Sequence, residues 1–128
     1  MRHGSACVWT SVGILVAALL RFAERATVLN VLLIVLGIVS ILNHMRRDVN
    51  TDEWCIRDTL HLFDMLCVVI VGLLMVWEYG LRLTFLIVAT VALLVYILLR
   101  THIVPFDLMA PCWASVHLLF ILMLFHVR

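Results

Sequence analysis

The sequence predicts an all-α fold, a polytopic helix bundle that crosses a membrane about five times. Hydrophobic residues make up 66% of the 128 residues and charged residues only 13%, whereas a soluble domain carries about 25% charged residues. The mean hydropathy is +1.19. The apolar residues form long runs without two-residue alternation, which favours membrane helices over the strands of a membrane barrel.

The same composition excludes several classes of protein. A water-soluble chain of 14.6 kDa has too much surface for its volume to hide this amount of apolar area, which excludes a soluble enzyme and a disordered tail. The net charge of +1 provides no basic surface for nucleic acid. We therefore expect residues 1–128 to form a single transmembrane domain in the plasma membrane or an endomembrane.

Five apolar runs define the expected spans, and polar or turn-forming residues separate them. The first run closes at Arg21, the second at His44 and the fourth at Arg100. A turn at Gly80 divides the third run from the fourth, and Pro105 breaks the chain before the fifth. The expected limits are residues 7–20, 26–43, 60–77, 83–99 and 108–125.

The first run also has the length of a signal-peptide apolar region, but the small-residue cleavage pattern around Ala23 is poor. The one long connection, residues 45–59, joins the second and third spans. It gathers acidic and basic side chains together with Trp54, a residue type that anchors proteins at the membrane interface.

Polar residues at the ends of the second and third spans form the main candidate site, because ionisable groups near a span are costly and suggest function. Ser40 and His44 are four residues apart and share one helix face. Asp58, His61 and Asp64 are spaced by three at the start of the third span. The long connection joins these helix ends, so a histidine, a hydroxyl and a carboxylate are expected to meet at one membrane boundary.

This grouping suits a zinc site. Imidazole and carboxylate are ordinary zinc ligands, and zinc turns a bound water into a nucleophile near neutral pH. Ser40 would hydrogen-bond that water or an oxyanion. Catalytic zinc usually has three protein ligands, however, and the pattern offers one histidine, His44, with one or two aspartates. The alternative is that these residues mark helix ends, with Asp58 or Thr59 as an N-cap and His44 among the lipid headgroups.

Other polar residues are expected to have structural roles. His117 in the fifth span, and Asn30 with Thr27 in the second, are expected to form hydrogen bonds between helices rather than to bind a ligand. Glu78 and Arg82 are expected to form a local ion pair.

The cysteines form no C-x-x-C pair, which argues against a zinc ribbon or a thioredoxin-like redox site. Three of them, Cys7, Cys67 and Cys112, lie in apolar runs and are expected to be small buried hydrophobic residues.

Several short segments, taken in order, resemble one membrane family. The segments are Arg21-Phe22 with Ala26, Ser40-Ile41-Leu42-Asn43-His44, Cys55 to Leu60 with Asp64, Leu83-Thr84-Phe85 and Ala110-Pro111-Cys112. They resemble the seven-span family that contains myomaker and the GPI-processing phospholipase A2, within the alkaline ceramidase and progestin/adipoQ receptor superfamily.

The resemblance implies a zinc ion in a polar core. His44 would be a metal ligand, Asp64 or Asp58 the carboxylate that orders the water, and Ser40 the hydrogen-bond partner of that water. The family completes its site with a His-x-x-x-His pair on its seventh span, whereas this chain resembles only the first five spans. His102, His117 or His126 would substitute only in an arrangement that the family does not show.

We therefore expect a shortened form with an incomplete metal site and a non-catalytic membrane role. One alternative is a zinc-dependent hydrolase of membrane lipids, similar to a phospholipase or ceramidase. Another is a small oligomeric channel or transporter subunit. The expected partners are membrane lipids, together with a second copy or a membrane protein that supplies further helices.

Overall fold

The computed structural model describes residues 5–50, 59–101 and 109–127. Over these residues the chain forms five helices and no strand, which confirms the predicted all-α fold. The helices are α1 (Ser5–Glu24), α2 (Val28–Asn50), α3 (Thr59–Tyr79), α4 (Leu83–Arg100) and α5 (Met109–His126).

Three of the helices are long and apolar enough to cross a membrane. Their candidate spans are Ala6–Glu24, Val28–Met45 and Thr59–Tyr79. Shorter apolar segments, Leu83–Leu98 and Pro111–His126, lie in α4 and α5. These lengths and compositions support the predicted membrane helix bundle. Helix α2 continues past the expected limit at residue 43 because the polar residues that close its apolar run do not interrupt the helix.

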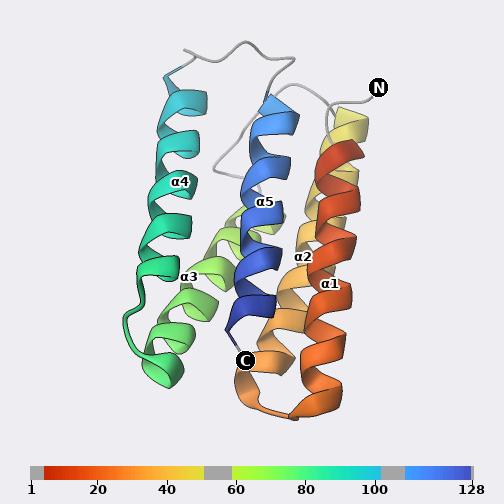
Figure 1. The fold of residues 1–128 in the computed structure, drawn as a ribbon. Coiled ribbons are helices and arrows are strands. Elements are labelled where there is room, and N and C mark those ends of the chain that lie inside the picture. Colours follow the sequence, from red (N-terminus) through yellow and green to blue (C-terminus); the bar gives the residue numbers. More distant parts are fainter. Residues whose placement is uncertain (1–4, 51–58, 102–108, 128) are drawn as a thin grey trace.

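Successive helices run in opposite directions, so the two ends of the chain lie at opposite ends of the bundle (Figure 1). Helix α1 packs against both α2 and α5, α2 also packs against α3, and α4 packs against α5. Helix α1 therefore connects α2 to α5. Its Ala17 and Ala18 are fully buried and belong to the apolar core, which includes Leu33 of α2, Met75 of α3 and Leu124 of α5.

The close approach of α1 and α2 depends on a glycine. A Cβ atom added at Gly37 would lie 2.8 Å from the Cα of Leu15, which is closer than two carbon atoms can pack. Small residues at such crossings let helix backbones approach each other in a membrane. Gly37 therefore sets the distance between these two helices.

A polar cluster joins four helices at the end of the bundle where the chain leaves α5. The buried Arg21 guanidinium donates from Nε to Asn30 Oδ1 at 3.0 Å, from Nη1 to the carbonyls of Leu124 (2.9 Å) and Val127, and from Nη2 to the Tyr79 hydroxyl at 2.6 Å. Asn30 in turn donates to the Arg21 carbonyl. The expectation that Asn30 joins helices is thus confirmed.

Two expectations near the helix ends need correction. Thr27 does not link helices. Its hydroxyl accepts a hydrogen bond from the backbone N–H of Asn30 at 3.2 Å and caps the start of α2. Arg82 does not pair with Glu78. It donates from Nε to the Tyr79 carbonyl, and its guanidinium lies 5.7 Å from the centre of the Tyr79 ring. Gly80, with φ of +78°, ends α3 between them, so Glu78 and Arg82 do not share a helix.

Candidate metal centre

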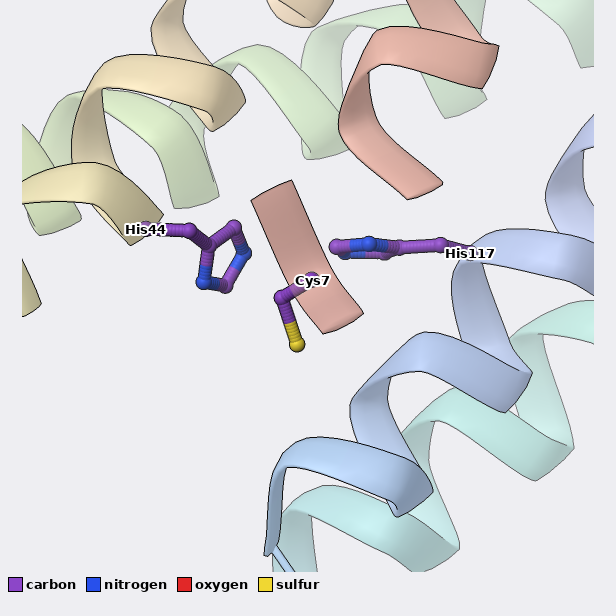
Figure 2. Close-up of side chains that lie close together, drawn as sticks. All are labelled: Cys7, His44 and His117. Carbon is purple, nitrogen blue, oxygen red and sulfur yellow. The ribbon is translucent and has the colours of Figure 1, made fainter. Parts of the chain in front are cut away.

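Three side chains with metal-binding atoms converge at the other end of the bundle. They are Cys7 of α1, His44 of α2 and His117 of α5, and their ligand atoms all lie within 4.8 Å of one another. Cys7 is 2% exposed and His44 8% exposed. The two imidazoles approach from opposite sides with Cys7 between them (Figure 2), and their ring centres are 5.2 Å apart at an interplanar angle of 66°.

The helix directions explain why residues so distant in sequence meet. Cys7 lies near the start of α1, and His44 lies toward the end of the antiparallel α2, so both are at the same end of the bundle. Helix α5 runs in the same direction as α1 and packs against it, with His117 in its first half. Helix α1 therefore stands between the two histidine-bearing helices and supplies the thiol.

Hydroxyl groups on the next turn of α1 support this cluster. The Thr10 hydroxyl lies 2.8 Å from His117 Nδ1 and also contacts the carbonyls of Ala6 (3.0 Å) and Cys7 (3.1 Å). The Ser11 hydroxyl donates to the Cys7 carbonyl at 2.6 Å and lies 2.7 Å from Ser40 Oγ. Side chains of α5 and α2 are thus both hydrogen-bonded to the turn that carries Cys7.

The structure places the predicted site residues in two groups. His44 lies in the metal-binding cluster, as expected for a ligand. Ser40 is one turn away, buried and hydrogen-bonded to Ser11. Asp64 faces α2, where its Oδ2 accepts a hydrogen bond from Asn43 Nδ2 at 2.9 Å. Asp58 lies outside the described residues.

Cys7 was not predicted as a ligand, and His117 was expected mainly to form a hydrogen bond between helices. Cys7 is buried, as expected of a cysteine in an apolar run, but it lies beside two imidazoles. His117 forms the expected hydrogen bond between helices, to Thr10, and also reaches the cluster. No spacing rule signals this group, because each member comes from a different helix. The sequence offers one cue for two of them: Cys7 begins the first predicted span and His44 follows the end of the second, whereas His117 lies in the middle of the fifth.

The donor set fits a transition metal. Thiolate and imidazole are typical zinc ligands, with bonds of about 2.3 Å and about 2.0–2.1 Å. Donors around tetrahedral zinc are consequently about 3.5 Å apart, so small side-chain rotations would bring atoms within 4.8 Å of one another to bonding distance. The cluster is therefore a possible metal-binding group.

Comparisons with known proteins add no relative. The chain matches no protein-family model, no curated protein and no solved structure.

Proposed function

We propose that this chain is a multi-pass membrane protein that binds zinc through Cys7, His44 and His117 and uses the metal to hydrolyse an ester or amide bond of a membrane lipid. The observation that carries this proposal is the convergence of three donor side chains from three helices. Three protein ligands with a fourth position for water is the usual arrangement of catalytic zinc. The expected shortened form lacks the two histidine ligands of the family's seventh span, and Cys7 and His117 would supply two other donors.

The depth of the cluster supports a lipid substrate. Cys7 lies at the beginning of the candidate span Ala6–Glu24, and His44 lies at the end of Val28–Met45. Both donors are therefore placed near a boundary of the apolar region. The ester and amide bonds that join lipid headgroups to their chains lie at this boundary, so a zinc-bound water there would be near bonds that it can attack.

The proposal agrees with the family resemblance at His44 and departs from it elsewhere. In that family the remaining histidine ligands come from the seventh span. Here Cys7 and His117 would take their place, which makes the zinc site one of mixed thiolate and imidazole character.

A second candidate function is non-catalytic, and one observation favours it. The hydroxyl expected to serve the water, Ser40, is hydrogen-bonded to Ser11, and the expected carboxylate, Asp64, is hydrogen-bonded to Asn43. If neither assists the water, zinc would only tie α1, α2 and α5 together. The protein would then bind zinc without cleaving lipid.

The first experiment measures zinc bound to the purified full chain in lipid nanodiscs. We expect about one zinc per chain, and loss of that zinc in Cys7→Ala, His44→Ala and His117→Gln. His126→Gln is the matched control, because His126 is exposed near the end of the same helix as His117. A wild-type chain without zinc, or stoichiometric zinc that survives His44→Ala, would refute the site.

The second experiment separates the two functions. Zinc-loaded protein is added to vesicles that contain labelled phospholipid or ceramide, and released fatty acid is measured against the zinc-free protein and His44→Ala. Zinc-dependent release supports the hydrolase. Stoichiometric zinc with no release on either lipid class supports the non-catalytic role.

A further inference from the structure

The Thr10 hydroxyl lies within hydrogen-bonding distance of two backbone carbonyls and one imidazole nitrogen. It lies 3.0 Å from the Ala6 carbonyl and 3.1 Å from the Cys7 carbonyl, and carbonyl oxygens only accept. The single hydroxyl proton serves one acceptor at a time, and the two carbonyls compete for it with His117 Nδ1. When the proton goes to a carbonyl, the 2.8 Å contact with His117 Nδ1 is a hydrogen bond that Nδ1–H donates to Thr10 Oγ1.

We infer that Thr10 is a positioning residue that holds His117 in the Nδ1–H tautomer and thereby reserves the Nε2 lone pair for the metal. A neutral imidazole has one protonated nitrogen and one with a free lone pair, and the hydrogen bond made by the first selects which nitrogen can bind a metal. Partners of this kind fix both the tautomer and the ring orientation of ligand histidines. This inference rests on the proposed zinc site.

Ser11 extends the same arrangement to α2. Its hydroxyl donates to the Cys7 carbonyl at 2.6 Å and also forms a hydrogen bond of 2.7 Å with Ser40 Oγ. Two adjacent hydroxyls on α1 thus attach both histidine-bearing helices to the turn that carries Cys7. The ligand-bearing helices are held together by protein groups before any metal binds.

The test uses two substitutions at one position and a matched control. Thr10→Val keeps the shape of the side chain and removes the hydroxyl, whereas Thr10→Ser keeps the hydroxyl. Thr84→Val is the control, because the Thr84 hydroxyl is buried in α4 without a hydrogen-bond partner in the described structure. All three are made in the full chain in micelles.

The first readout is the tautomer itself, measured by imidazole nitrogen NMR on zinc-free protein at pH 8, where neutral imidazole prevails. The His117 signals are assigned by their loss in His117→Gln. We expect the Nδ1–H form in the wild type, Thr10→Ser and Thr84→Val, and a shift toward the Nε2–H form in Thr10→Val. The Nε2–H form in the wild type, or no change in Thr10→Val, would overturn the inference.

The second readout is zinc affinity, with cobalt absorption as a check on coordination geometry. Thr10→Val is expected to weaken zinc binding by about 10–100-fold, while Thr10→Ser and Thr84→Val stay close to the wild type. Unchanged affinity in Thr10→Val would also contradict the inference. A wild type that binds no zinc refutes the proposed function instead, and the NMR result still decides the tautomer.

Discussion

Arg21 shows how one buried side chain can specify the arrangement of several helices. Arg21 is 7% exposed, and its guanidinium donates to groups on α2, on α3 and at the end of α5. The carbonyls at the end of a helix have no partners within that helix, and they carry the negative end of its dipole. Arg21 supplies both a partner and a positive charge to them, so it caps α5 from a neighbouring helix.

We therefore expect Arg21→Lys to destabilise the protein although it keeps the charge. A lysine has no planar fork and cannot reach acceptors on three helices at once. The lost hydrogen bonds should lower the free energy of unfolding by about 2 kcal/mol. Detergent-induced unfolding followed by circular dichroism measures this change. Arg25→Lys, at an exposed position, is the control. An equal effect of both substitutions would disprove that the planar guanidinium of Arg21 stabilises the protein.

Residue type and position predicted some of these contacts and not others. Asn30 and His117 were expected to form hydrogen bonds between helices, because a polar group among apolar neighbours needs a partner in a membrane, and both do. Cys7 could not be assigned in the same way. A buried cysteine needs no partner, so only its distance from His44 and His117 identifies it as a possible ligand.

At the scale of the element, α1 is the helix on which the site depends. It packs against α2 and α5, and it carries Cys7, Thr10 and Ser11. The existence of the helices and their approximate limits follow from the apolar runs in the sequence. Their neighbours do not, because in lipid every apolar face is equally well solvated and only small residues and polar contacts select a partner. Gly37 and Arg21 are such selecting residues.

Gly37→Ala tests the role of close packing between α1 and α2. The added methyl would lie 2.8 Å from the Leu15 Cα, a backbone atom that moves only if the helices separate. Overpacking of this kind costs about 1–3 kcal/mol, which exceeds the gain of about 1 kcal/mol from replacing glycine by alanine in a helix. A lower unfolding midpoint is expected in the same detergent assay.

The matched control for this substitution is Gly72→Ala in α3. Nothing lies within 4 Å of a Cβ atom added at Gly72, so only the gain in helix propensity remains, and the variant should be as stable as the wild type or slightly more stable. If Gly37→Ala were equally harmless, the close approach of α1 and α2 would have no energetic importance.

At the scale of the whole molecule, the exposed surface tests the membrane assignment. Val69, in the middle of α3, is 55% exposed, and Leu81, in the turn after it, is 69% exposed. In a membrane, arginine at the centre of a span costs about 2.5–3.5 kcal/mol, whereas arginine at the boundary reaches water. In a soluble protein, an arginine would be tolerated at either of these exposed positions.

Val69→Arg should therefore reduce stable membrane integration, while Leu81→Arg should not. The measurement is the fraction of protein that resists alkaline extraction from membranes. Equal retention of both variants and the wild type would contradict the placement of α3 across the membrane.

Zinc, if bound, would act on the stability of the entire bundle. Its three ligands lie on α1, α2 and α5, so unfolding must separate them and release the metal. A ligand that binds only the folded state stabilises it by about 2.7 kcal/mol when its free concentration is 100 times the Kd. Zinc should thus raise the unfolding midpoint of the wild type.

Cys7→Ala should abolish that increase, because two histidines alone bind zinc weakly. Cys67→Ala should retain it, since Cys67 lies on α3 and outside the cluster. The comparison of each variant with and without zinc cancels any packing cost of the substitution itself. An increase that persists in Cys7→Ala would mean that zinc stabilises the bundle from another site. An increase that is lost in Cys7→Ala and kept in Cys67→Ala would mean that the Cys7 thiol is needed for zinc to stabilise the bundle.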